Sequence, residues 1–183
     1  MISYLHTKRG FTLIEMIVSI GLFTIVLFIA SSAFLSVVNA DRKSRATRLT
    51  MDNLTVAMED MTRRMKTGFA YMCEGTIEST TTDVRDCLTP STSVVFTDQE
   101  GKRTGYSLSG GRIVRQIESS GPTLFVTAPE IIISSLTFDV QGTDSSDNIQ
   151  PYIRIFIDGT TGGGVTDSRF NLQTMVTQRS YDI

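Results

Sequence analysis

The sequence predicts an α+β fold in which one long N-terminal helix packs on a C-terminal antiparallel β-sheet. Residues 16–40 form an uncharged and strongly apolar run. Residues 44–66 contain neither proline nor glycine and carry apolar side chains at alternating steps of three and four, as on one face of a helix. The second half consists of short β-branched segments bounded by glycine, proline, aspartate and serine. The part of the 183-residue chain beyond the apolar run suits one compact domain.

The apolar run is long enough to cross a membrane. Its 25 uncharged residues exceed the roughly 20 that a bilayer-spanning helix needs. Glu15 lies at the N-terminal end of the run, where an unpaired carboxylate costs on the order of a few kcal/mol. We therefore expect this acid to have a partner, and the nearest candidate is a new amino terminus created by cleavage just upstream.

Residues 9–15, Arg-Gly-Phe-Thr-Leu-Ile-Glu, resemble the processing site of type IV prepilins and pseudopilins. The context matches too, because Lys8 and Arg9 close a short basic leader before the apolar helix. The resemblance implies that a membrane-embedded prepilin peptidase cuts between Gly10 and Phe11 and methylates the new amino terminus of Phe11.

The resemblance also implies an assembly surface formed by Thr12, Leu13, Ile14 and Glu15. Glu15 is expected to pair with the ammonium group of Phe11 on a neighbouring subunit. Two charges that are each costly in lipid become tolerable as a pair.

The order of elements in the second half resembles minor pilins and pseudopilins, most closely the J class of type II secretion. The implied fold is type IV pilin-like, and the implied function is a structural, non-enzymatic filament subunit without a cofactor. An initiating tip complex is its expected place in the filament. The implied partners are other pilin-type subunits, the inner-membrane assembly platform and the lipid bilayer. The implied location is the inner membrane, with the C-terminal domain extracytoplasmic, and then a periplasmic or cell-surface filament.

Two other interpretations remain open. A secretory signal peptide, cleaved after residues 38–40, has an apolar core of only about 7–15 residues. A single-pass anchor for a binding or sensor domain that never polymerises does not explain Glu15. The basic residues after the run also outnumber Lys8 and Arg9, which by charge alone favours a cytoplasmic C-terminal part. They are Arg42, Lys43, Arg45 and Arg48.

The helix is expected to continue from Phe11 to about Thr67, ended by Gly68. An apolar stripe on its second half should pack against the protein's own sheet; it comprises Met51, Leu54, Met58, Met61 and Met65. Cys73 and Cys87 follow in a polar stretch, and outside the cytoplasm such a pair is expected to form a disulfide. Two free thiols are the alternative.

Strands are predicted at 94–97, 104–108, 112–117, 135–140, 152–158 and 170–177, in one antiparallel, mainly meander-like sheet. Residues 109–111, Ser-Gly-Gly, predict a tight hairpin, and residues 130–133 either begin a strand or extend the next one. The expected organisation is a leader at 1–10, a membrane and filament-core helix at 11–40, an extracytoplasmic amphipathic helix at 41–68, a polar loop with the cysteine pair at 69–92, and the sheet domain at 93–183.

The composition gives little indication of catalysis or of nucleic-acid binding. The net charge is −2, and the only histidine, His6, lies in the expected leader. Lys102 and Arg103 are interpreted as a solvated turn. A group of oxygen-bearing side chains is interpreted as a polar hairpin tip rather than a metal site, because its spacing matches no calcium loop. It comprises Asp139, Asp144, Asp147 and Asn148.

Overall fold

The computed structural model describes residues 10–161 and 169–179. The chain forms two compact units, Met1–Arg45 and Ala46–Ile183. A single helix, α1 (Leu13–Thr67), contains the boundary between them. The predicted helix is therefore confirmed, except that it begins two residues after Phe11.

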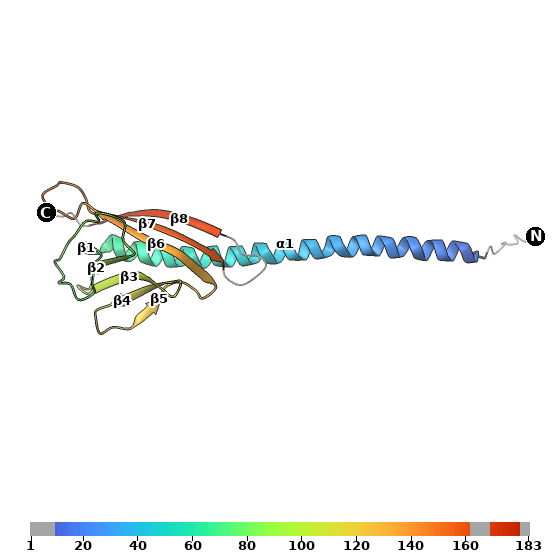
Figure 1. Cartoon of the computed structure of the whole chain (residues 1–183), viewed down its shortest axis with the longest axis horizontal. Coiled ribbons are helices and arrows are strands. Elements are labelled where there is room, and N and C mark those ends of the chain that lie inside the picture. Colours follow the sequence, from blue (N-terminus) through green and yellow to red (C-terminus); the bar gives the residue numbers. More distant parts are fainter. Residues whose placement is uncertain (1–9, 162–168, 180–183) are drawn as a thin grey trace, which may run out of the picture. The chain divides into compact units, whose positions relative to one another are not determined.

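The second unit contains two antiparallel sheets (Figure 1). In each sheet every strand pairs with the next along the chain. The first sheet comprises β1 (Phe69–Cys73), β2 (Ser93–Thr97), β3 (Arg103–Ser109), β4 (Arg112–Ile117) and β5 (Thr123–Phe125). The second comprises β6 (Ile131–Gln141), β7 (Tyr152–Thr161) and β8 (Arg169–Thr177).

The meander order and all six predicted strands are confirmed, but the prediction of a single sheet is wrong. Of residues 130–133, the last three form the start of β6 rather than a strand of their own, and Glu130 precedes it. Two strands were not predicted, β1 and β5. β1 occupies the first residues of the expected polar loop, and β5 has only three residues. Alternation identifies a strand but not its partners, so it could not divide the strands between two sheets.

Glycines determine two of the chain reversals. Gly68 ends α1, and its N–H donates to the carbonyls of Arg64 and Met65. A Cβ at this position would lie 2.5 Å from the Phe96 ring, so the chain can turn from helix to β1 only without a side chain here. Gly110 and Gly111 both have positive φ, which is the backbone that a tight two-residue hairpin between β3 and β4 requires.

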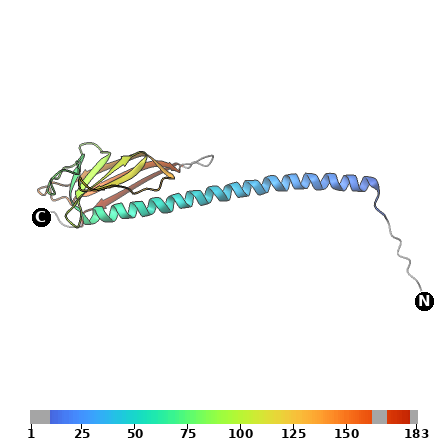
Figure 2. The same cartoon turned by 90° about the horizontal axis from the view of Figure 1, so that it is seen from below.

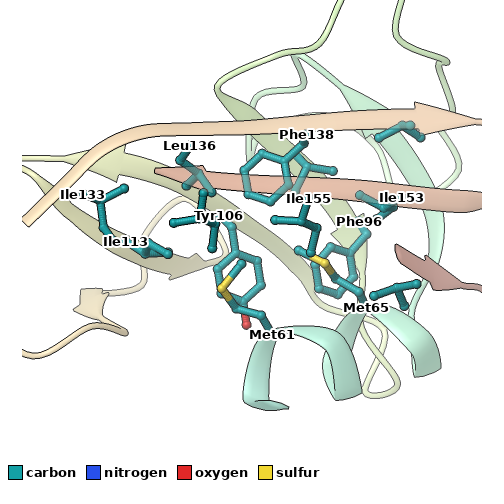
Figure 3. Close-up of a cluster of buried hydrophobic side chains, with 14 of the residues drawn as sticks. Met61, Met65, Phe96, Tyr106, Ile113, Ile133, Leu136, Phe138, Ile153 and Ile155 are labelled. Atoms are coloured by element: carbon teal, nitrogen blue, oxygen red, sulfur yellow. The ribbon is translucent and has the colours of Figure 1, made fainter. Parts of the chain in front are cut away.

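The core lies where the C-terminal turns of α1 meet both sheets, which run along one side of the helix (Figure 2). Figure 3 shows Met61 and Met65 of α1 against Phe96 and Tyr106 of the first sheet. Side chains of the second sheet close the same cluster; they include Leu136, Phe138, Ile153 and Ile155. The two sheets therefore share one core with the helix.

The predicted apolar stripe on α1 packs into this core with one exception. Leu54, Met61 and Met65 are fully buried, and Met58 is partly buried. Met51 is exposed whereas its neighbour Thr50 is buried, so at this turn the buried face of α1 is offset by one residue from the predicted stripe.

Candidate processing and assembly site

The first turn of α1 is fixed by a reciprocal pair of side chains. The backbone N–H and the hydroxyl group of Thr12 each donate to Oε2 of Glu15, both at 3.3 Å. In return, the backbone N–H of Glu15 donates to Oγ1 of Thr12 at 3.3 Å. This capping box satisfies two N–H groups that a helix start otherwise leaves unpaired. It explains why the helix begins at Leu13 and not at Phe11.

This second role of Glu15 was missed in the sequence. The signal was present, because a threonine followed three residues later by glutamate before an apolar run is the pattern of a capping box. We considered Glu15 only as the partner of an ammonium group and did not consider this capping pattern.

The backbone at Gly10 and Phe11 is non-helical and exposed. The Phe11 side chain is 78% exposed, and a Cβ at Gly10 would meet nothing within 4 Å. Exposed backbone outside regular structure is where a peptidase can bind its substrate. Lys8 and Arg9 lie outside the described residues, so the structure gives no position for the expected basic leader.

The apolar part of α1 has the properties of a membrane span. In the described chain, one helix is long and apolar enough to cross a bilayer, and its best 18-residue window has a mean hydropathy of 2.6 with none of it buried. Two hydroxyl groups in this part bond to its own backbone. Thr24 donates to the carbonyl of Ile20 at 2.7 Å and Ser32 to that of Ile29 at 2.9 Å. Such bonds allow hydroxyl groups to face lipid at low cost.

Residues 5–31 match the family model of the prokaryotic N-terminal methylation motif. This motif indicates a protein of the type IV pilin and pseudopilin type, made as a precursor for prepilin peptidase. No curated protein and no solved structure matches the chain. The indication of a pilin-type protein therefore comes from the N-terminal segment. The long helix with antiparallel sheets agrees with a type IV pilin-like fold.

The basic residues that follow the apolar span lie on α1 and are exposed to solvent. Arg45 forms an ion pair with Asp41 at 2.9 Å, and their side chains are 76% and 57% exposed. An exposed pair one helical turn apart stabilises a helix by only about 0.3–0.5 kcal/mol. This pair therefore adds little to the stability of α1.

Cys73 and Cys87 form the expected disulfide. Cys73 belongs to β1 in the first sheet. Cys87 is held by the second sheet, because its N–H donates to the carbonyl of Val140 at 2.8 Å and its carbonyl accepts from the Gln141 amide at 2.9 Å. The bond thus connects an edge of one sheet to an edge of the other, which the sequence could not indicate.

Arg103 is not the solvated residue that the sequence suggested. Its side chain is buried, and Nη1 donates to the carbonyl of Ala70 at 2.7 Å and to Oγ1 of Thr97 at 3.2 Å. Nη2 donates to the carbonyl of Asp83 at 3.2 Å. Burial lowers the pKa of Arg103, and the nearby Asp83 carboxylate partly offsets this. Arg103 therefore fastens the irregular β1 strand and the disulfide loop to β2 and β3.

The acidic side chains around residue 144 bond to nearby groups of the protein, an arginine side chain and backbone N–H groups. Asp139 pairs with Arg154, and Asp144 accepts from the backbone N–H of Ser146 at 2.9 Å. Asp147 accepts from the N–H of Ile149 at 2.6 Å. Among the described residues, no three His, Cys, Asp or Glu side chains gather in a way that could hold a metal ion. The group lies on β6 and in the connection to β7, where these bonds shape a polar loop.

Proposed function

We propose that this chain is a minor pilin or pseudopilin, a structural filament subunit without enzymatic activity. The observation that carries the proposal is the methylation motif at residues 5–31, which includes an exposed Gly10–Phe11 bond directly before a capped apolar helix. The order of strands resembles the J class of type II secretion, and subunits of that class form initiating tip complexes. We extend both features to this chain as part of the proposal.

We propose that the subunit is first made as a single-pass precursor with the leader 1–10 in the cytoplasm. Prepilin peptidase cuts between Gly10 and Phe11, recognising the leader that ends in Lys8 and Arg9, and methylates Phe11. The helix 11–40 then moves from the bilayer into the filament core, and the segments 41–68, 69–92 and 93–183 remain outside the cytoplasm.

The disulfide supports this orientation. Structural disulfides persist in the periplasm and at the cell surface, and they are rare in the cytoplasm. We give the disulfide more weight than the basic residues after the span, because a charge bias can be overridden by other topological signals.

Cleavage creates a charge that Glu15 is placed to neutralise. The new ammonium group on Phe11 adds positive charge next to a helix N-terminus, which already carries a partial positive charge from its unpaired N–H groups. A carboxylate can accept about four hydrogen bonds, so the bonds from Thr12 leave capacity for an ammonium group of a neighbouring subunit. Leu13 and Ile14, 79% and 66% exposed, supply apolar contact surface beside it.

The amino terminus of the membrane-extracted protein tests the processing step. Mass spectrometry should find a chain that begins at N-methylated Phe11. A chain that begins at Met1 would support a simple membrane anchor, and one that begins at Asp41 would support a cleaved secretory signal. Either result would overturn the proposal.

Two variants of Glu15 separate its charge from its capping role. Glu15→Gln keeps the capping box, because glutamine serves there as well as glutamate, and it removes the charge. We expect Glu15→Gln and Glu15→Ala to be inserted and cleaved normally and to enter filaments poorly. Thr12→Ala, which removes the cap alone, is expected to have a smaller effect. Wild-type incorporation of Glu15→Gln would show that charge pairing does not drive assembly.

A further inference from the structure

The outer edge of β8 is the one long sheet edge that the described residues leave uncovered. β1 is bordered by Arg85, whose N–H donates to the carbonyl of Tyr71 at 3.1 Å. β6 is bordered by Ser91, which exchanges two backbone bonds with Phe138 at 2.8 and 2.7 Å. β5 has only three residues. β8 pairs with β7 over nine residues, and within residues 10–161 and 169–179 no segment pairs with its other side.

β8 also lacks the features that normally protect an edge strand. Proteins block such edges with proline, lysine, bulges or very short strands, because unpaired N–H and C=O groups otherwise recruit another chain. β8 contains no proline, lysine, glycine or acidic residue, and it keeps a continuous register with β7. Its one charged residue, Arg169, is the first of the strand, outside the part that borders the groove described below. Its exposed edge is therefore suited to strand addition.

A groove runs beside this edge, between the C-terminal part of β8 and one face of α1. Its volume is about 1350 Å³. The helix side extends from Val56 to Thr67, about 17 Å at 1.5 Å per residue. The strand side extends from Thr174 past the end of β8 to Arg179, about 17 Å at 3.3 Å per residue. The two sides meet at Arg179, whose N–H donates to the carbonyl of Lys66 at 2.9 Å, so an extended segment can lie along β8 before this point.

The groove combines apolar surface with excess positive charge. Val56 and Met175 are 67% and 62% exposed. Arg63, Lys66 and Arg179 line the groove and are exposed. Two acids also line it. Glu59 is exposed, and Asp60 binds Arg64 and Arg115 at 2.9 Å and pairs with Arg63 at 3.5 Å, so three cations share its charge. An occupant that complements this surface carries apolar and acidic side chains.

We propose that this groove binds an extended segment of another protein chain, which adds to β8 as a further strand and directs carboxylates toward Arg63, Lys66 and Arg179. Backbone bonds to β8 supply the affinity, and the basic rim selects an acidic segment. The inference is independent of the proposed processing, because every groove residue lies in the unit Ala46–Ile183. A failed test here leaves the amino-terminal prediction untouched, and the reverse also holds.

A labelled six-residue peptide in which valine and glutamate alternate tests the proposal directly. Its binding to the full chain in detergent micelles is measured by fluorescence anisotropy. Two matched peptides serve as comparisons, one with lysine in place of glutamate and one methylated at every backbone amide, which removes the N–H donors from both edges of the peptide. We expect both to bind about tenfold more weakly or worse, because one loses charge complementarity and the other loses backbone bonds.

Variants of the chain locate the binding site. Met175→Glu and Arg63→Glu should each weaken binding of the acidic peptide about tenfold. Leu88→Glu and Arg48→Glu make the same charge changes at exposed positions outside the groove and should leave binding unchanged. The proposal is overturned if the N-methylated peptide binds equally well, if the groove variants bind like their controls, or if the acidic peptide fails to bind at about millimolar concentration.

Discussion

Removing the carboxylate of Asp60 is expected to loosen α1 from the first sheet. Asp60 accepts from Nε of Arg64 at 2.9 Å and from Nη1 of Arg115 at 2.9 Å, and Arg63 approaches to 3.5 Å. Arg115 belongs to β4, so its bond is the one that links the helix to a sheet. The side chains of Asp60 and Arg115 are 26% and 15% exposed. This places the pair between a surface ion pair and a fully buried one.

The magnitude of the Asp60–Arg115 interaction follows from its distance and burial. Two unit charges about 4 Å apart attract by about 4 kcal/mol at an effective dielectric constant of about 20. Desolvation of the partly buried pair offsets much of this, and Arg64 continues to neutralise Asp60 when Arg115 is removed. We therefore expect a net coupling of about 1–2 kcal/mol.

A double-mutant cycle measures this coupling. The variants are Asp60→Asn, Arg115→Gln and the combination, and urea unfolding of the full chain in detergent is followed by near-ultraviolet circular dichroism. The signal reports the buried rings of Tyr71 and Tyr106, because the chain has no tryptophan. Arg63→Gln is the matched control; its side chain is 77% exposed, so we expect less than about 0.5 kcal/mol. A coupling below about 0.3 kcal/mol would refute the reasoning.

The same pair predicts how stability depends on pH. Burial by itself raises the pKa of Asp60, but the hydrogen bond and charge of Arg64, together with the charge of Arg115, outweigh it and hold the pKa below 3.8. A carboxyl group with a lowered folded-state pKa stabilises the fold above its unfolded pKa and loses that effect as the pH falls through the folded value. The difference between wild type and Asp60→Asn should be complete at about pH 7 and shrink below about pH 4. A difference that stays constant on acidification would contradict this.

Two further changes test the packing of the second unit. Replacing Cys73 and Cys87 by serine should lower the free energy of unfolding by about 3 kcal/mol, because the disulfide closes a loop between cysteines 14 positions apart; alkylation of both thiols in unreduced exported protein would contradict the disulfide. Gly68→Ala should lower it by about 1–3 kcal/mol, because the new Cβ would lie 2.5 Å from the Phe96 ring. Gly21→Ala is the control, since a Cβ there meets nothing within 4 Å, and equal effects of the two substitutions would show that the contact with Phe96 is unimportant.

The apolar stripe on α1 shows which buried residues the periodicity of the sequence can predict. Alternating steps of three and four identified Leu54, Met61 and Met65 as the packed face, and all three are fully buried. The same pattern included Met51, which is exposed, although Thr50 on the same turn is buried. Periodicity defines a face only approximately, and the packed structure decides which of two adjacent residues that face includes.

Arg103 shows what periodicity cannot detect. A basic residue beside Lys102 in a hairpin is ordinarily solvated, and no local pattern distinguishes this one. It is buried because β1 and the disulfide loop bring the carbonyls of Ala70 and Asp83 to the same place. These acceptors are separated from Arg103 by 33 and 20 residues, so only the folded chain brings them together.

The N-terminal part of this protein is determined by its sequence alone. The methylation motif, the apolar span and the helix are patterns of residues within a few positions of each other, so they can be recognised in a short window. The tertiary structure decided the division into two sheets, the connection that Cys73 and Cys87 make between them, and the open edge of β8. Those features depend on which distant strands pair, and a strand's own sequence does not specify its partner.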